Sequence, residues 1–226
     1  EEINRKVTDS ICDYLFTTEK SATENLRNEG VKGNNIFFVG NVMIDTLSYC
    51  LEKIKNMALP VTGITDKNYA TITLHRPSNV DDAIVLKRIL YTLEKIQKDI
   101  PVIFPIHPRT KKNVKKFKLT TKNIYFIEPV SYANFINLQK NAKLVFTDSG
   151  GVQEESCILQ TPCLTIRNNT ERPETVNVGG NIICGYSPNK IIKFANIMFK
   201  KKRKWKVPLG AGNTSQIILK HLKSIL

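Results

Sequence analysis

The sequence lacks the features that mark secreted and membrane proteins. Its five cysteines are an odd number and include no C-x-x-C pair, so we interpret them as reduced thiols. No apolar run approaches the roughly 20 residues that a membrane-spanning helix needs, and no signal-like segment is found. We therefore expect a cytoplasmic location and no membrane partner.

Metal ligands and several enzyme motifs are also missing. The three histidines, at 75, 107 and 221, are not spaced like a histidine zinc site, and no Cys or Asp cluster accompanies them. The sequence has neither the G-x-x-x-x-G-K-[ST] loop of nucleoside triphosphatases nor the G-x-S-x-G turn of hydrolases. No metal site is predicted.

Acidic residues are scarce relative to basic ones. There are 20 Asp and Glu against 34 Lys and Arg, which gives a net charge of +14. Such a charge could indicate a polyanionic partner. However, the basic residues are dispersed and are not interleaved with the aromatic and glycine pattern of single-strand binders. We interpret them as solvated faces and expect no nucleic-acid partner.

Short apolar runs alternate with helical patterns along the chain. The runs predict strands at residues 14–16, 36–39, 70–74, 102–106, 124–127, 144–147, 163–166 and 182–184. The intervening patterns predict helices near residues 21–29, 81–97, 110–117, 132–140, 151–159, 188–198 and 214–226. This alternation predicts an α/β fold, a Rossmann-like doubly wound parallel sheet with helices on both faces.

The N-terminal part does not make a domain by itself. Residues 1–46 offer two strands and one helix, which is too few for a stable parallel sheet. The six later strands suffice for a complete domain. We therefore expect residues 1–62 to be the remnant of a first domain plus a linker, residues 63–208 to be a whole domain, and residues 209–226 to be a helix that could pack back on the first domain.

Polar residues gather after several predicted strands. Ligands of such sheets bind beyond the carboxyl ends of the strands. The residues found there are basic or compatible with phosphate, namely His75, Arg76, His107, residues 149–151, Arg167 and residues 170–174. A single histidine at a strand end is usually structural. Several basic or phosphate-compatible residues at the same edge of the sheet instead predict one anion site, and a diphosphate would suit that site well.

The segment Asp148-Ser149-Gly150-Gly151-Val152-Gln153-Glu154-Glu155 follows a strand and opens a helix. A helix start presents unpaired backbone N–H groups, and glycines let a pyrophosphate approach the main chain. Glu155 lies about one turn inside the helix, within reach of a ribose hydroxyl. Ser-Gly-Gly alone would more often be an ordinary strand-to-helix turn.

Five motifs in register resemble the non-hydrolysing UDP-N-acetylglucosamine 2-epimerases, whose two-domain fold is of the GT-B type. Residues 1–5 are similar to the PEExNR segment without its proline, and residues 40–45 to GNxxID. Residues 73–76 contain the HR pair, residues 148–155 match DSGGxQEE, and residues 167–174 match RxxTERPE. The resemblance covers essentially the whole chain, as the C-terminal portion of such an enzyme.

The resemblance implies a reaction. These enzymes interconvert UDP-N-acetylglucosamine and UDP-N-acetylmannosamine, in the supply of surface polysaccharide, without a nicotinamide or metal cofactor. UDP is eliminated to give 2-acetamidoglucal and is then added back with the opposite configuration at C2. A carboxylate must handle the C2 proton, and cationic or hydrogen-bonding groups must stabilise the departing diphosphate.

The resemblance also implies roles for individual residues. Ser149, Gly150 and Gly151 would hold the diphosphate, Glu155 the ribose, and Arg172 the sugar or its phosphate. Phe135 would pack near the uracil, although a core role is equally compatible with its helical spacing.

Catalytic roles are implied for His75, which would assist UDP departure, and for Glu1, one of the family's pocket carboxylates. Arg5 would lie close to the substrate. A homodimer is implied, with Arg76 and His107 as candidates for an activator pocket. Without the motif register, Glu1 and Arg5 would be interpreted as a charged chain end.

The sequence departs from the family pattern in three respects. Ser78 replaces the Glu of HRxEN, Val130 replaces a polar residue that contacts the base in some relatives, and the N-terminal half with its further carboxylates and phosphate-binding cations is not present. We therefore expect this chain to be inactive alone, and to work with an N-terminal half that belongs either to the same protein or to a split-gene partner. Alternatives are a UDP-sugar-binding module without turnover, or the nucleotide-binding half of a GT-B glycosyltransferase.

Overall fold

The computed structural model describes residues 2–97, 100–122, 124–208, 210 and 212–225. The chain forms two compact units, one made of residues 1–49 and 208–226 and the other of residues 50–207. The division falls within one helix, and the domain boundary predicted near residue 62 stays a prediction. No helix in the described ranges is long and apolar enough to cross a membrane.

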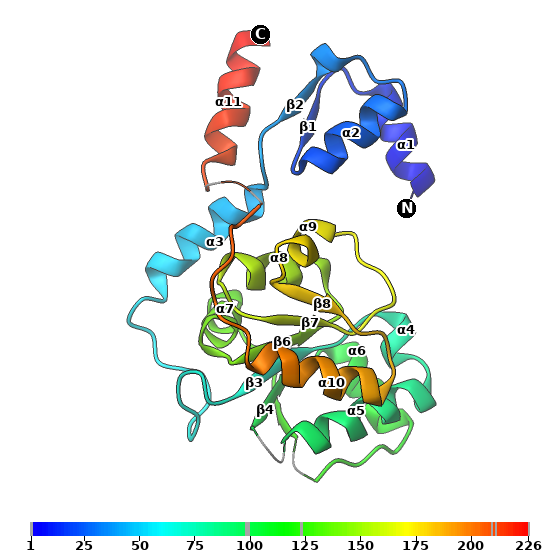
Figure 1. Cartoon of the computed structure of the whole chain (residues 1–226), viewed down its shortest axis with the longest axis vertical. Coiled ribbons are helices and arrows are strands. Elements are labelled where there is room, and N and C mark those ends of the chain that lie inside the picture. The colour runs from blue at the N-terminus through cyan, green and yellow to red at the C-terminus, as the bar shows by residue number, and fades with distance from the viewer. Residues whose placement is uncertain (1, 98–99, 123, 209, 211, 226) are drawn as a thin grey trace. The chain divides into compact units, whose positions relative to one another are not determined.

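The second unit is built on a six-stranded parallel sheet (Figure 1). Its strands are β3 (Ala70–Thr73), β4 (Val102–Pro105), β5 (Tyr125–Ile127), β6 (Leu144–Thr147), β7 (Cys163–Thr165) and β8 (Asn181–Ile183). Their spatial order is β5-β4-β3-β6-β7-β8. The direction of winding therefore reverses between β3 and β6, as in a doubly wound dinucleotide-binding fold. The predicted fold class is confirmed.

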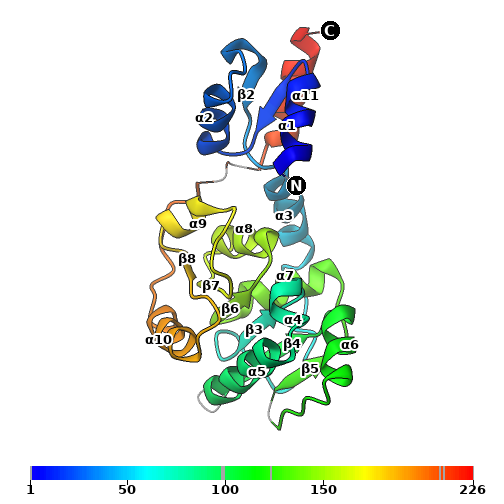
Figure 2. The same ribbon diagram turned by 90° about the vertical axis from the view of Figure 1, so that its right-hand side faces the viewer.

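Helices cover both faces of this sheet (Figures 1 and 2). They are α4 (Pro77–Val80), α5 (Ala83–Gln97), α6 (Pro108–Lys116), α7 (Tyr132–Asn141), α8 (Gly150–Ile158), α9 (Pro173–Asn177) and α10 (Pro188–Phe199). Because side chains alternate along a strand, Ile72 and Phe146 pack in one core with α5 and α10. Ile103 and Val145 belong to a second core, with α7 and α8 on the opposite face. Both faces are thus apolar, as a parallel sheet requires.

The first unit contains a two-stranded parallel sheet. Its elements are α1 (Glu2–Ile11), β1 (Leu15–Thr17), α2 (Lys20–Asn28), the 3-10 helix η1 (Gly33–Asn35), β2 (Ile36–Phe38), α3 (Val42–Lys53) and α11 (Thr214–Ile225). A small core joins Leu15, Leu26 and Ile36.

The C-terminal helix α11 packs within this first unit. Asp45 of α3 accepts hydrogen bonds from the backbone N–H groups of Thr214 at 3.0 Å and Ser215 at 2.7 Å. At the sheet, the ring of His221 lies 4.6 Å from that of Phe37, centroid to centroid. Gly212 has a φ of +81° and approaches Ser48 so closely that an added Cβ would lie 2.8 Å from its Oγ. The turn before α11 therefore favours glycine.

The expectation of a single helix in residues 1–46 is wrong. Helix α1 occupies residues that the sequence left unassigned, and α3 begins at Val42. The apolar residues of α1, Ile3, Val7 and Ile11, recur every four positions but none of its residues is buried. A helix without a buried residue provides no core contact from which to predict it.

Candidate functional site

The site forms where β3 and β6 lie side by side. Thr73 pairs with Thr147 at the carboxyl ends of these two strands, so the turns that follow them are neighbours. One turn carries His75 and Arg76, and the other carries residues 148–151. The gap between these strands is the point at which doubly wound sheets bind ligands.

Asp148 joins the two turns. Its fully buried carboxylate accepts hydrogen bonds from His75 N at 3.0 Å, Arg76 N at 2.9 Å and Asn79 Nδ2 at 3.0 Å. The Asn79 amide also donates to the carbonyl of Ile166 at 2.9 Å, at the end of β7. Sequence reasoning did not select Asp148 or Asn79. A carboxylate that follows a fully apolar strand was the available signal, because a buried charge must be paired.

The His75 side chain also contacts Asp148. Its Nδ1 lies 3.2 Å from Asp148 Oδ1. Burial lowers the pKa of His75 below its ordinary value, the Asp148 charge opposes this, and His107 and Arg76 reinforce it. Burial therefore favours the neutral form of His75.

The start of α8 is arranged to receive an anion. Ser149 is the N-cap, yet its side chain makes no capping hydrogen bond to the helix, while its backbone N–H donates to Thr147 Oγ1 at 3.0 Å. A Cβ added to Gly151 would meet no atom within 4 Å, and one added to Gly150 would meet only Glu171 Oε2, at 3.9 Å. The helix N-terminus is therefore open, with its partial positive charge directed at that space.

Glu155 is held by neighbours from α7. It accepts a hydrogen bond from Gln139 Nε2 at 2.7 Å, and Ser156 Oγ donates to Gln139 Oε1 at 3.2 Å. Burial raises the pKa of Glu155, against the lowering effect of hydrogen bonds from Gln139 and Tyr132. Such a carboxyl group has a fixed orientation, which suits recognition of a hydroxyl pair.

The segment of residues 167–174 is tied to α8. Thr170 Oγ1 donates to Gln153 Oε1 at 2.6 Å. Arg172 Nε lies 2.6 Å from Oε1 of the buried Glu154, as an ion pair rather than an aligned hydrogen bond.

The same segment contains a second ion pair. Arg167 binds Glu171 through both terminal nitrogens, at 2.8 and 2.6 Å, and this bond lowers the pKa of Glu171 to about 2. Both arginines already have acidic partners, so a direct ligand contact by Arg172 stays a prediction.

Other predicted residues lie near this site or in the core. Phe135 and Val130 pack against the core that contains Leu138 and Val152, so the core role of Phe135 is present and its contact with uracil stays a prediction. His107 caps α6 by accepting from Arg109 N at 3.2 Å, and its ring lies 5.5 Å from that of His75.

Arg76 and Ser78 complete this part of the chain. The Nε of Arg76 is buried and has no hydrogen-bond partner among the described residues, and Ser78 is exposed on α4. The activator role of Arg76 and His107 stays a prediction.

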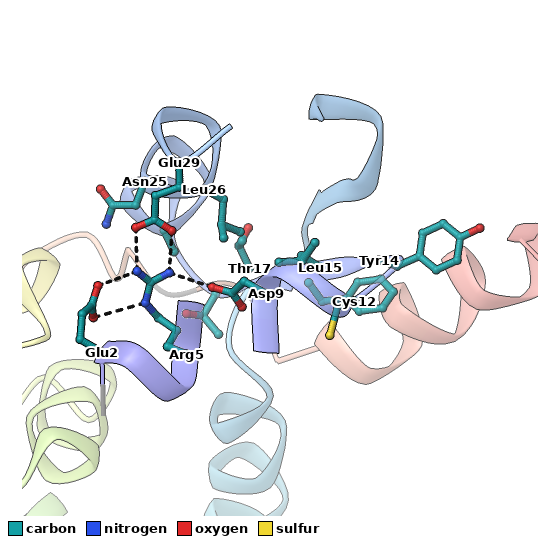
Figure 3. A pocket seen from close by; sticks show the side chains of 13 residues that line it. Glu2, Arg5, Asp9, Cys12, Tyr14, Leu15, Thr17, Asn25, Leu26 and Glu29 are labelled. Carbon is teal, nitrogen blue, oxygen red and sulfur yellow. Dashed lines mark hydrogen bonds and ion pairs between the residues drawn. The ribbon is translucent and has the colours of Figure 1, made fainter. Parts of the chain in front are cut away.

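Arg5 lies in the first unit, beside a pocket of about 620 Å³ (Figure 3). Its guanidinium makes five hydrogen bonds to three carboxylates, those of Glu2, Asp9 and Glu29. These bonds use all five of its N–H donors, so its substrate-binding role stays a prediction. Glu1 lies outside the described residues. Within the described part of the chain, no group of three His, Cys, Asp or Glu side chains could hold a metal ion.

Comparison with known proteins gives consistent matches. The profile of the family described as UDP-N-acetylglucosamine 2-epimerase matches residues 1–223. A UDP-N-acetylglucosamine 2-epimerase of Methanocaldococcus jannaschii is 48% identical over 233 residues, which cover 98% of this chain and 64% of that protein. Another, of Methanococcus maripaludis, is 42% identical and is covered to 63% of its length.

A solved structure agrees with these matches. The crystal structure of the M. jannaschii enzyme in complex with UDP-GlcNAc and UDP superposes with a TM-score of 0.89 at 45% identity, over 99% of this chain and 64% of that one. The present chain thus spans slightly less than two thirds of the length of the proteins it matches.

Proposed function

Because this chain belongs to the UDP-N-acetylglucosamine 2-epimerase family, whose solved members have the GT-B-type α/β fold, we propose that it is the UDP-binding part of a non-hydrolysing epimerase. The complete enzyme interconverts UDP-N-acetylglucosamine and UDP-N-acetylmannosamine, for the synthesis of surface polysaccharide. The observation that carries this proposal is the open, glycine-lined start of α8 at the β3–β6 switch point, with His75 on the adjoining turn.

The chemistry follows from these positions. The diphosphate lies against the Ser149 side chain and the backbone N–H groups of Gly150 and Gly151, and Glu155 accepts from the ribose hydroxyls. His75 assists departure of UDP from the anomeric carbon, while a carboxylate removes the C2 proton to leave 2-acetamidoglucal. Return of the proton to the opposite face and re-addition of UDP invert C2. Stabilisation of the leaving diphosphate is the contribution of this chain.

We propose that further residues complete the catalytic pocket. About one third of the length of the M. jannaschii relative is not matched by this chain, and Glu1 is the only carboxylate that the motifs assign to catalysis here. The exposed apolar stripe of α1 supports this proposal, because Ile3 and Ile11 are 77% exposed and Val7 55%. A partner that supplies the missing strands of the first sheet covers that stripe. On this account the present chain alone does not epimerise.

Two alternatives are less well supported. A UDP-sugar-binding module that works by itself would be expected to cover its apolar surface, whereas α1 leaves its stripe exposed. A glycosyltransferase half would share the fold, but the family match extends over residues 1–223 and includes the segments at both ends of the chain. A homodimer and a cytoplasmic location stay predictions.

The test is an epimerisation assay in D₂O. UDP-N-acetylglucosamine is incubated with this chain, with and without the segment of the M. jannaschii relative that it does not match. The expected result is UDP-N-acetylmannosamine carrying deuterium at C2, formed only by the mixture and lost in His75→Gln. Lys111→Gln, a change at an exposed residue paired with Glu128, is the matched control and retains activity.

Other products would contradict the proposal. Free N-acetylmannosamine with stoichiometric UDP would indicate a hydrolysing enzyme. Transfer of the sugar to an added acceptor without exchange at C2 would indicate a glycosyltransferase.

A further inference from the structure

One buried carboxylate lies directly behind the histidine that assists UDP departure. Asp148 is fully buried, whereas the side chain of His75 is 36% exposed, and 3.2 Å separates Asp148 Oδ1 from His75 Nδ1. The same carboxylate accepts the backbone N–H groups of His75 and Arg76. The backbone contacts are hydrogen bonds, whereas Nδ1 of the ring approaches Oδ1 closely without an aligned hydrogen bond. Asp148 is itself fully buried and is screened from any ligand.

We propose that Asp148 is a positioning residue that accepts the Nδ1–H of His75 and so makes Nε2 the ring nitrogen available to the departing diphosphate. This inference deepens the proposed function and rests on it. Asp148 acts through His75 and does not touch the substrate.

The chemistry of the pair supports this assignment. An ionised carboxylate can only accept hydrogen bonds, and a neutral imidazole carries one N–H. The negative charge of Oδ1, 3.2 Å from Nδ1, therefore favours the Nδ1–H tautomer, which leaves a lone pair on Nε2. When a diphosphate arrives, Nε2 is the atom that can take up a proton and donate it, and Asp148 stabilises the resulting imidazolium. The opposite tautomer would place the only N–H away from Asp148 and the lone pair against its negative charge.

Among the described groups that act most strongly on His75, Asp148 is the one that favours the protonated form. The other groups that influence it are His107 and Arg109 from the start of α6 and Arg76, the next residue in the chain. Burial and these three groups lower the pKa of His75, and only Asp148 raises it. Removing the charge of Asp148 must therefore lower the His75 pKa further, and must not raise it.

The experiment is nitrogen NMR of the histidine side chains in the intact 226-residue chain. The chain has three histidines, at 75, 107 and 221, so a His75→Gln variant identifies the signals of His75. The wild type is expected to hold His75 in the Nδ1–H tautomer above its pKa. In Asp148→Asn the titration midpoint of His75 is expected to fall by about one pH unit or more, and the tautomer preference to be lost, because an amide N–H can face Nδ1.

A matched variant separates the specific contact from a general change of charge. Asp81→Asn removes a carboxylate from the same region, one that accepts hydrogen bonds from Arg109 and from Asn113 Nδ2 rather than facing the His75 ring. It is expected to leave the tautomer of His75 unchanged. Amide spectra report whether each variant is folded.

Two results would overturn the inference. One is an Nε2–H tautomer of His75 in the wild type. This result would refute the role of Asp148 even if Asp148→Asn does not fold. The other is an Asp148→Asn variant with an unchanged tautomer and midpoint. Neither measurement uses a ligand, so a failure of the proposed function would appear separately, as a folded wild type with this tautomer that binds no UDP.

Discussion

At the scale of single residues, the site consists of charges that are already paired inside the protein. Arg172 contacts Glu154, Arg167 contacts Glu171, and Asp148 accepts donors from three residues. A buried charge that loses its partner costs more than the pair itself contributes. Substitutions at these positions therefore change stability as well as binding, and the two effects have to be separated.

Arg172→Ala should lower the free energy of unfolding because it removes the ion partner of the 3% exposed Glu154 side chain. We expect a loss of about 2 kcal/mol, below the 3–5 kcal/mol of fully buried pairs, since Arg172 is partly solvated. The double variant Arg172→Ala/Glu154→Gln should recover most of that loss, as measured by urea unfolding. Equal stability of the two variants would show that the ion pair does not carry the effect.

Protonation of Glu171 should lower the free energy of unfolding in acid. Its pKa is lowered from 4.5 to about 2 by the hydrogen bonds of Arg167, so its contribution is complete above pH 4.5 and is lost as the pH falls toward 2. Glu171→Gln should therefore be less stable than the wild type at pH 7, with a difference that shrinks between pH 4.5 and 2. Glu128→Gln, at an exposed residue paired with Lys111, should follow the wild type throughout. A pH-independent gap for Glu171→Gln would contradict the linkage.

The contacts between residues that are distant in the sequence were the part of the site that could not be predicted. The strand-end pattern selects His75 and residues 149–151 because it depends only on neighbours in the chain. The contact of Asp148 with His75 joins residues 73 positions apart, and nothing local to either residue encodes it. The same holds for Gln139 and Glu155, which lie on adjacent helices.

At the scale of elements, the start of α8 is a helix end that the fold leaves open. Gly151→Ala should not destabilise the chain, because its Cβ would meet no atom within 4 Å and alanine is up to about 1 kcal/mol better than glycine in a helix. Thermal unfolding should show an equal or higher midpoint than the wild type. A marked drop would mean that this glycine serves the fold and not a ligand.

Asp45 should anchor α11. Its pKa is pushed upward by burial but held below its ordinary value by hydrogen bonds from Ser215 and Thr214. Asp45→Ala should cost about 0.5–2 kcal/mol, the usual range for loss of a helix cap. It should also speed amide exchange in the first turn of α11.

Ser215→Ala removes only one of the three hydrogen bonds to Asp45, and should have a smaller effect. If Asp45→Ala left exchange in α11 unchanged, the helix would be held by its apolar contacts alone.

Elements were predictable where they pack within their own unit. The strands of the six-stranded sheet are mostly apolar and buried, except at the edge strand β5, where Tyr125 is 51% exposed. Their pattern is therefore visible locally, and parallel order follows from the helices between the runs. Helix α1 was missed because its apolar residues Ile3, Val7 and Ile11 are exposed and belong to no core in this chain. Helix α3 was also missed, although its Ile44 and Leu47 are buried.

At the scale of the whole molecule, the exposed stripe of α1 should matter only in the completed enzyme. Ile3→Ser/Val7→Ser should leave the stability of this chain within about 0.5 kcal/mol of the wild type, because neither side chain is buried. The same variant should lose the ability to be complemented in the epimerisation assay. Ile84→Ser, at a residue 68% exposed on α5, is the control that retains complementation. Equal complementation by both variants would refute the role of the stripe.

The most direct test of the account is calorimetric titration of UDP into the 226-residue chain, its Gly151→Ala variant and the control Gly33→Ala, whose Cβ would also meet open space. If the diphosphate binds at the start of α8, the wild type has one UDP site and Gly33→Ala has unchanged affinity. The affinity of Gly151→Ala is then at least about tenfold weaker, equivalent to about 1.4 kcal/mol. Equal affinity of all three proteins, or no binding by a folded wild type, would contradict a diphosphate site at the start of α8.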